Sequence, residues 1–139
     1  MISLAKSIVK DGEGATKLIE IIVEGAQSEE DAKEMAYAVA HSNLVKTAFF
    51  GEDPNWGRII SAAGSTGIPF STDSLELYID DVPLFMHGRG TQGKEAAERV
   101  MKRDTIRVLV RLGMGKETFR VYTSDLSHDY VDINALYHS

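Results

Sequence analysis

Apolar residues recur along the chain at two spacings, one typical of helices and one typical of strands. Helical spacing, with apolar residues three and four positions apart, covers four segments: 2–9, 28–41, 56–63 and 94–103. Strand character, from alternation or from short β-branched runs, covers six segments: 18–23, 44–50, 75–80, 82–86, 106–112 and 119–123. Helices and short strands are therefore mixed along the chain, without an internal repeat.

Turn and capping residues mark the limits of these elements. Ser28 followed by Asp31 resembles a capping box at the start of the second helix, and Asn55 is well suited to cap the third. The segment 113–115, with two glycines, predicts a hairpin turn between the last two strands. The apolar run 18–23 is nearly continuous, which indicates a strand covered on both faces.

This order of elements favours an α+β fold, with a mixed β-sheet and helices packed mainly on one face as a two-layer sandwich. Domains of roughly 150 residues are common, so the 139 residues are expected to form a single domain, residues 1–139. Neither a low-complexity tract nor a long linker interrupts the sequence.

The composition excludes several classes of protein. Apolar residues make up 43% of the chain, enough for a core, and 15 basic against 21 acidic side chains give a net charge of -6. This acidic balance argues against a general surface for nucleic acid or anionic membranes. Cysteine is absent, and we find neither a signal peptide nor an apolar run of about 20 residues. We therefore expect a soluble, cytoplasmic protein.

One stretch of the chain, residues 89–111, departs from the acidic balance. It holds seven basic and three acidic residues, a local charge of +4. Such a stretch could face an anionic ligand, with an affinity that would depend strongly on salt. A solvated helix and strand face is the simpler interpretation.

The common catalytic and metal-binding arrangements have no clear match. The sequence contains no Gly-x-Ser-x-Gly elbow, and its four histidines are widely spaced without a carboxylate cluster. We therefore predict no metal site, no cofactor and no catalytic nucleophile within the chain. Gly88 and Gly90 flank Arg89 ahead of a helix, which suits an anion cradle or, more simply, a hairpin exit that needs positive φ.

Glu13 differs from the other acidic residues because it stands between Gly12 and Gly14. Its carboxylate therefore lies on backbone that can approach a ligand closely, and a carboxylate binds an ammonium group well. A solvated loop acid is the alternative interpretation.

The segment 53–58 is the least generic stretch of the chain. It combines Pro54, a capping asparagine and Trp56 at a predicted helix start, which favours a rigid structural corner. Arg58 would lie in the first turn of that helix, where the helix dipole disfavours a cation. We therefore expect a carboxylate partner for Arg58, with Asp53 as the candidate.

Three sequence blocks together resemble one known family. They are DGEGATK at 11–17, GEDPNWGRII at 51–60 and DLSHDYVDIN at 125–134. In this combination and order they are similar to ornithine acetyltransferase, also called glutamate N-acetyltransferase. The resemblance covers the C-terminal part of that family's β chain.

The resemblance implies an enzyme of arginine biosynthesis that moves an acetyl group from N-acetylornithine to glutamate. Members of the family cleave themselves into α and β chains, and a threonine at the new β-chain N-terminus carries the acetyl group; some also accept acetyl-CoA. That threonine has no counterpart here, so the implied partners are the α chain and the remainder of the β chain, in a heterotetramer. The isolated 139 residues are expected to be inactive.

The resemblance also implies three substrate-binding residues. Glu13 matches the glutamate whose carboxylate holds the substrate amino group. Asn134 and Ser139 match the tail residues that donate hydrogen bonds to the substrate carboxylate. Leu136 and His138 stand where the family usually has Asp and Arg, and these two departures bear on how the tail docks.

The alternative is a non-catalytic module of the same fold, which binds an amino acid or mediates assembly. Its support is that the sequence begins with Met1. The two hypotheses differ in whether an adjoining segment supplies the threonine nucleophile.

Overall fold

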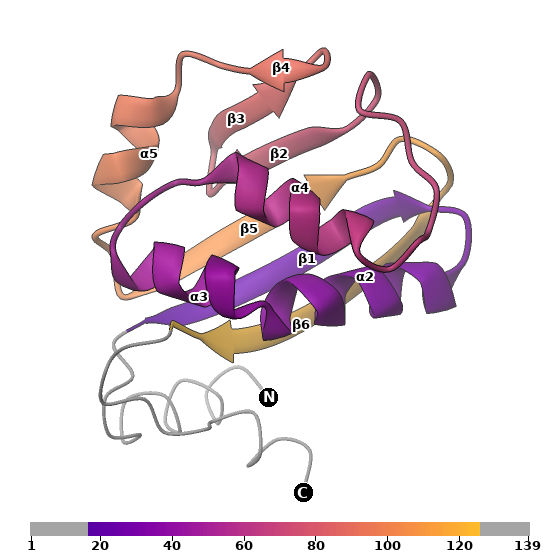
Figure 1. The fold of residues 1–139 in the computed structure, drawn as a ribbon, viewed down its shortest axis with the longest axis horizontal. Coiled ribbons are helices and arrows are strands. Elements are labelled where there is room, and N and C mark those ends of the chain that lie inside the picture. The colour runs from indigo at the N-terminus through magenta and orange to yellow at the C-terminus, as the bar shows by residue number, and fades with distance from the viewer. Residues whose placement is uncertain (1–16, 126–139) are drawn as a thin grey trace, which may run out of the picture.

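The computed structural model describes residues 17–125, and these residues have the expected α+β architecture. The strands are β1 (Leu18–Ala26), β2 (Glu76–Ile79), β3 (Val82–Met86), β4 (Arg89–Gly90), β5 (Thr105–Arg111) and β6 (Glu117–Ser124). They form one six-stranded sheet in the order β4-β3-β2-β5-β1-β6. The helices are α2 (Glu29–His41), α3 (Asn43–Phe50), α4 (Trp56–Gly64) and α5 (Lys94–Val100). Figure 1 shows α2, α3 and α4 in front of one face of the sheet, which confirms the two-layer arrangement.

Strand β1 lies between β5 and the edge strand β6. It pairs in parallel with β5 and antiparallel with β6. The side chains of Ile19, Ile21 and Val23 point toward the helices and are fully buried. Leu18 and Ile22, on the other face, are buried as well. The expectation of a strand covered on both faces is therefore confirmed.

Helix α2 supplies the largest apolar stripe that packs on the sheet. Its buried residues recur at helical spacing: Ala32, Met35, Ala36, Val39 and Ala40. The Ser28 Oγ accepts the backbone N–H of Asp31 at 3.0 Å and caps the helix as predicted. Three acidic residues in the first turn complement the helix dipole. The capping and the apolar spacing together explain why this segment is helical.

The prediction of a strand over 44–50 is wrong, because this segment forms helix α3. The Ser42 side chain caps it by accepting the N–H of Val45 at 3.2 Å. Val45, Ala48 and Phe49 share the buried face at helical spacing, whereas Leu44 stays 61% exposed. The cap and the packing of one face on the core outweigh the β propensity of the valine, threonine and phenylalanines.

The predicted hairpin between the last two strands is also wrong. Strand β1 lies between β5 and β6, and the connection from β5 to β6 crosses over the end of β1. The N–H groups of Met114 and Gly115 both donate to the carbonyl oxygen of Gly25 there, at 2.8 and 2.7 Å. Gly25 has φ +78°, and a Cβ on it would lie 2.8 Å from the backbone nitrogen of Gly113. The glycines therefore allow a close crossing of two backbones rather than a hairpin turn.

The turn between β3 and β4 confirms the hairpin interpretation of Gly88, which required a positive φ. His87 and Gly88 both have positive φ, 55° and 77°, as a two-residue hairpin turn requires. Helix α5 then begins at Lys94 as predicted and ends at Val100, three residues before the predicted end. The helix predicted over 2–9 lies outside the described residues.

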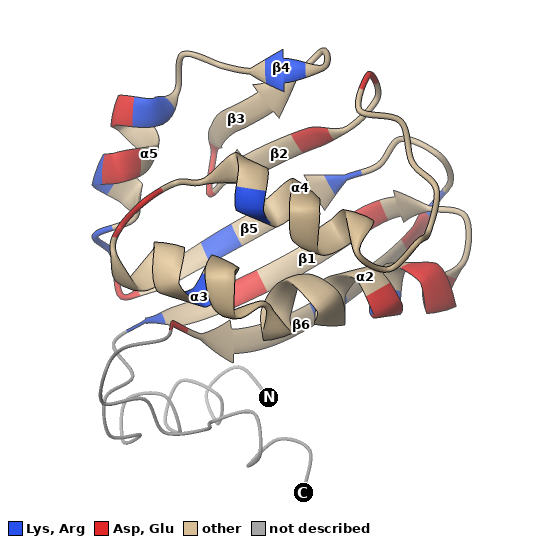
Figure 2. Cartoon of the chain, viewed as in Figure 1, with Lys and Arg blue, Asp and Glu red and all other residues tan. Residues whose placement is uncertain are grey.

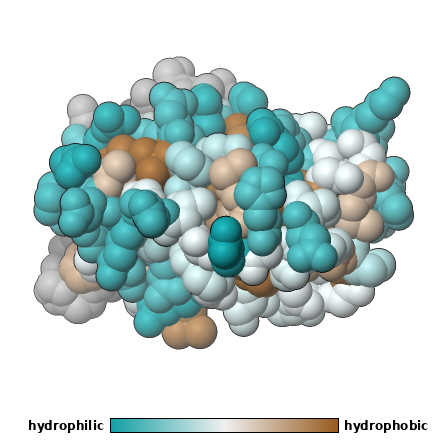
Figure 3. Space-filling model, turned by 90° about the horizontal axis from the view of Figure 1, so that it is seen from above, coloured by the Kyte–Doolittle hydropathy of each residue, from teal (hydrophilic) through white to brown (hydrophobic). Residues whose placement is uncertain are grey.

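One face of the molecule is largely hydrophilic. Figure 3 looks onto the molecule from above the edge with β4, and it shows only small, separate hydrophobic patches between hydrophilic side chains. Within residues 17–125, no helix combines the length and the apolar character needed to cross a membrane.

Candidate functional site

The beginning of β1 and the end of β6 lie side by side. Leu18 is opposite Ser124 in the antiparallel register of these strands. One residue further out, the backbone N–H of Lys17 donates to Asp125 Oδ1 at 3.0 Å in a buried hydrogen bond. The first and last described residues, Lys17 and Asp125, are therefore adjacent.

The side chain of Lys17 brings a third segment to the same place. Its ammonium group donates to the carbonyl oxygen of Arg103 at 3.2 Å and lies 3.8 Å from Glu52 Oε2. The Lys17 side chain is only 7% exposed, so a nearby carboxylate offsets part of the cost of burying its charge. Lys17, Glu52 and Asp125 belong to the first, second and third of the sequence blocks described above. We call these three residues the junction.

Glu52 lies in an unusual backbone position within the junction. The end of α3 has the two hydrogen bonds of a Schellman motif, from the N–H of Asp53 to Ala48 O at 2.8 Å and from the N–H of Glu52 to Phe49 O at 3.1 Å. Glu52 occupies the left-handed position of this motif, with φ +57°. Glycine is the usual residue there, because a Cβ makes this conformation unfavourable.

Electrostatics keep the Glu52 carboxyl group ionised. A hydrogen bond from Lys102, at 3.1 Å, is the main reason that the pKa of Glu52 is lowered from its ordinary value. Burial opposes this shift, and attraction to Lys102 and Lys17 adds to it. A lowered pKa means that the carboxylate stabilises the fold above its unfolded pKa and loses this effect as the pH falls through its folded pKa.

The corner at 53–58 is built from capping and packing. Asn55 Oδ1 accepts the N–H of Arg58 at 3.1 Å and caps α4 as predicted. The expected ion pair between Arg58 and Asp53 is wrong: the Arg58 guanidinium donates to Leu44 O at 2.9 Å and to the Thr47 hydroxyl at 3.3 Å. Both acceptors lie on α3, the segment that the sequence predicts as a strand. The contacts of Arg58 tie α3 to α4.

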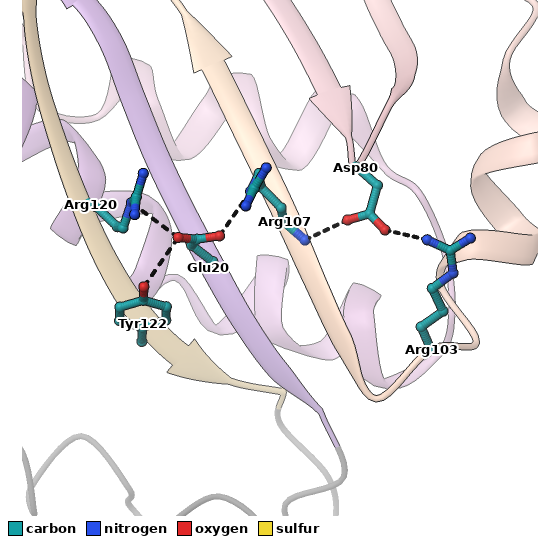
Figure 4. A network of polar contacts seen from close by, with 6 residues as sticks. All are labelled: Glu20, Asp80, Arg103, Arg107, Arg120 and Tyr122. Atoms are coloured by element: carbon teal, nitrogen blue, oxygen red, sulfur yellow. Dashed lines mark hydrogen bonds and ion pairs between the residues drawn. The ribbon is translucent and has the colours of Figure 1, made fainter. Parts of the chain in front are cut away.

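Polar side chains on the face of the sheet away from the helices form a second cluster, which Figure 4 shows with the helices behind the strands. Glu20 on β1 accepts from Arg107 Nε at 2.9 Å and from the Tyr122 hydroxyl at 3.2 Å, and it forms an ion pair with Arg120 Nε at 3.0 Å. The hydrogen bond to Glu20 raises the pKa of Arg107. Burial, with a contribution from Glu20, raises the pKa of Tyr122. Arg107 therefore stays charged and Tyr122 stays neutral at neutral pH.

Ion pairs with other segments account for much of the basic stretch 89–111. Figure 2 shows basic residues on β5 beside acidic residues on β1. Four of the seven cations pair with carboxylates, namely Lys102, Arg103, Arg107 and Arg111. Their partners come from other segments, so the local excess of charge in the sequence is largely neutralised in the fold. The anion-binding alternative therefore gains no support from these four residues.

A hollow of about 280 Å³ lies over this cluster. Its lining carries both signs of charge: Glu20, Asp80, Asp81, Arg103, Thr105, Ile106 and Arg107. Asp80 bridges two of these residues, because it accepts from the Arg103 guanidinium at 2.7 Å and from the backbone N–H of Arg107 at 2.8 Å. Within residues 17–125, no three histidine or carboxylate side chains are grouped closely enough to hold a metal ion.

The three substrate-binding residues expected from the sequence, Glu13, Asn134 and Ser139, lie outside the described residues, as do Leu136 and His138. The structure instead brings together Lys17 and Asp125, which adjoin the segments that carry these residues. Sequence reasoning missed the junction because Lys17 and Asp125 stand at the ends of their blocks and Glu52 was taken as part of a turn. The sequence carried no signal for the position of Glu52, because it predicted a strand over 44–50 where the structure has the end of helix α3.

Comparisons with known proteins support the family resemblance that the three sequence blocks indicate. The sequence model of the ArgJ family matches residues 1–139. The chain is 51% identical over 139 residues to the arginine biosynthesis bifunctional protein ArgJ of Geobacter sulfurreducens, covering 99% of this chain and 35% of that protein. It is 48% identical over 143 residues to a glutamate N-acetyltransferase of Methanocaldococcus jannaschii, covering 96% of this chain and 36% of that protein.

A solved structure is similar as well. The crystal structure of the arginine biosynthesis bifunctional protein ArgJ from Bacillus halodurans matches with a TM-score of 0.85 and 40% sequence identity. The match covers 97% of this chain and 64% of the other chain. This chain thus spans about a third of the length of the curated relatives. Its sequence and its fold together show that the chain belongs to the ArgJ family.

Proposed function

We propose that the chain is the C-terminal part of the β chain of a glutamate N-acetyltransferase, and that residues 1–139 form one domain of it. The complete enzyme would move an acetyl group from N-acetylornithine to glutamate in the cytoplasm, as a heterotetramer of α and β chains. Acetyl-CoA is a further candidate donor. Family membership and the printed names of the relatives from Geobacter and Methanocaldococcus support this proposal.

In this function the chain binds substrate and leaves the acetyl transfer to a threonine elsewhere in the enzyme. The Glu13 carboxylate accepts hydrogen bonds from the backbone amino group of ornithine or glutamate. The Asn134 amide and the Ser139 hydroxyl donate to the substrate carboxylate. Charge-assisted hydrogen bonds of this kind are strong and directional, so they hold the reacting amino group in a fixed place.

One observation carries the proposal: the hydrogen bond of 3.0 Å between the Lys17 N–H and the Asp125 carboxylate. Glu13 lies four residues before Lys17, which limits its distance from the junction to about 14 Å. Asn134 lies nine residues after Asp125, which limits its distance to about 32 Å. Both segments can therefore reach one amino-acid ligand near the junction.

Replacing Glu13 tests the proposed role directly. In the complete enzyme, Glu13→Gln should raise KM for N-acetylornithine and for glutamate by about tenfold or more, because a charge-assisted hydrogen bond is lost. Steady-state kinetics with each substrate measures this. Glu34→Gln, an exposed position on α2, serves as the matched control and should leave both KM values unchanged. If Glu13→Gln also left them unchanged, Glu13 would have no role in binding.

The isolated 139-residue chain should show no acetyl transfer, because it lacks an activated nucleophile. Acetyl transfer by this polypeptide alone would contradict the proposal that the threonine nucleophile lies in another part of the enzyme. A complete protein that binds glutamate but never forms an acetyl-enzyme would instead favour the non-catalytic module.

A further inference from the structure

Helices α2, α3 and α4 lie on one side of the sheet and leave the other side of β2, β5, β1 and β6 without them (Figure 1). On that other side the side chains of Arg107, Arg111 and Arg120 stay 57%, 45% and 50% exposed. We call this side of the four strands the open face. Six charged residues form its centre, on neighbouring strands: Glu20, Glu24, Glu76, Arg107, Arg111 and Arg120.

Glu20 joins two of these arginines. Its carboxylate lies 2.9 Å from Arg107 Nε and 3.0 Å from Arg120 Nε, and it accepts the Tyr122 hydroxyl at 3.2 Å (Figure 4). The Glu20 side chain is only 9% exposed. The carboxylate is therefore already shielded from water and has three donors close by before any partner covers it.

Arg111 joins the two other glutamates. Its guanidinium group lies 2.7 Å from Glu24 and 3.2 Å from Glu76, and it lies over the ring of Tyr78, 5.4 Å from the ring centroid. The Tyr78 hydroxyl donates to Glu76 at 2.9 Å. Three arginines and three glutamates thus neutralise one another across the four strands, although the chain as a whole carries a net charge of -6.

The choice of residues suits an interface between proteins. The four strands contain no lysine, so each cation among the six charged residues is an arginine. Arginine is more weakly hydrated than lysine, and both arginine and tyrosine are enriched where proteins meet. A guanidinium group has five N–H donors, and the ion pairs above use only part of them. The open face therefore offers N–H donors and two tyrosine rings, with its six charges already paired.

We propose that the open face is the surface through which this chain docks onto the remainder of the complete enzyme. The partner surface has a low net charge and presents carbonyl or hydroxyl acceptors and apolar side chains to the arginines and tyrosines. The length of the relatives favours this partner, because the chain spans 35% of the Geobacter protein and 64% of the solved Bacillus chain. The inference rests on the proposed function, which makes this chain one part of a larger enzyme.

A second copy of this chain fits the open face less well. In a two-fold symmetric contact the same patch meets itself, so guanidinium groups would face guanidinium groups near the axis. Their N–H donors would then lack acceptors. The net charge of -6 on each copy would also oppose the contact.

Cysteine labelling of the complete enzyme tests whether the open face is covered. This chain has no cysteine, and Thr105 and Thr118 are exposed at two opposite corners of the open face. Thr105→Cys and Thr118→Cys should each react with a maleimide about tenfold more slowly than Glu34→Cys, at an exposed position on α2. Mass spectrometry of the labelled peptides measures the three rates. Equal rates would overturn the inference.

A photoreactive residue identifies what covers the face. In the complete enzyme, Thr118→benzoylphenylalanine should cross-link to a residue outside the 139 residues of this chain, which mass spectrometry of the digested product locates. Cross-links confined to residues 1–139, within one copy or between two copies, would overturn the proposed partner. The absence of any cross-link would overturn it as well.

Arg111→Lys tests what the arginines contribute. It keeps the charge but loses the planar guanidinium group, which matters little in water and much at a covered face. The melting temperature of the complete enzyme should therefore fall by about 3 °C or more. Lys102→Ala removes an ion pair outside the open face and should leave it unchanged. Equal effects of the two substitutions would overturn the inference, whereas the kinetics of Glu13→Gln test the proposed function separately.

Discussion

The hydroxyl groups of Thr123 and Ser124, at the end of β6, differ in their hydrogen bonding because they lie on opposite faces of the sheet. Thr123 points toward the helices and donates to the carbonyl oxygen of Ala40 at 3.2 Å. Ser124 points to the other face and is equally buried, yet its Oγ has no hydrogen-bond partner among the residues that the structure describes. A buried polar group without a partner opposes folding, whereas a satisfied one contributes modestly to stability.

These two side chains give a paired prediction for folding stability. Thr123→Val should lower the free energy of unfolding by about 1 kcal/mol, because it leaves the Ala40 carbonyl unsatisfied. Ser124→Ala should leave the free energy of unfolding unchanged or raise it by roughly a few tenths of a kcal/mol, because the substitution removes an unpaired hydroxyl. Urea-induced unfolding of the two variants measures both. A loss in Ser124→Ala as large as that in Thr123→Val would mean that Ser124 has a partner after all.

Individual residues were predicted from the sequence where their role is local. Ser28 and Asn55 cap helices as expected, because a cap depends only on residues two or three positions away. The carboxylate partner expected for Arg58 is wrong, because its guanidinium donates to the carbonyl oxygen of Leu44, fourteen residues away on α3. Glu52 was not recognised, because its neighbours Lys17 and Lys102 are distant in sequence.

At the scale of elements, the sequence pattern gave most helices and strands but not all of their pairings. The segment 44–50 is rich in residues with β propensity, and only the cap at Ser42 and the burial of one face make it a helix. The strands β5 and β6 were found but were taken as neighbours. Insertion of β1 between them depends on parallel pairing with a segment more than eighty residues away, as between Ile21 and Val108, which a local pattern cannot reveal.

The crossing of the β5–β6 connection over β1 predicts which glycines are essential. A Cβ added at Gly115 would overlap the carbonyl group of Ala26, so Gly115→Ala should lower the free energy of unfolding by about 2 kcal/mol. Gly64→Ala is the control, because a Cβ at Gly64 meets no atom within 4 Å at the end of α4. It should be neutral or slightly stabilising. Equal tolerance of both substitutions in urea unfolding would contradict the crossing.

At the scale of the whole molecule, the fold gathers segments that are far apart in the sequence at one end of the sheet. The blocks at 11–17, 51–60 and 125–134 meet through Lys17, Glu52 and Asp125. Recognition of the family from these blocks was possible without a structure, and family membership is confirmed. How Glu13, Asn134 and Ser139 are arranged remains a prediction, because the described residues end at the positions from which their segments start.

The most direct test is a crystal structure of the complete enzyme with glutamate bound. We expect a Glu13 carboxylate oxygen within hydrogen-bond distance of the ligand's α-amino nitrogen, about 2.7–3.0 Å. The Asn134 amide and the Ser139 hydroxyl should donate to the ligand's α-carboxylate, with the Lys17–Asp125 hydrogen bond intact beside them. Glutamate bound at a site where none of these three residues reaches it would contradict the account.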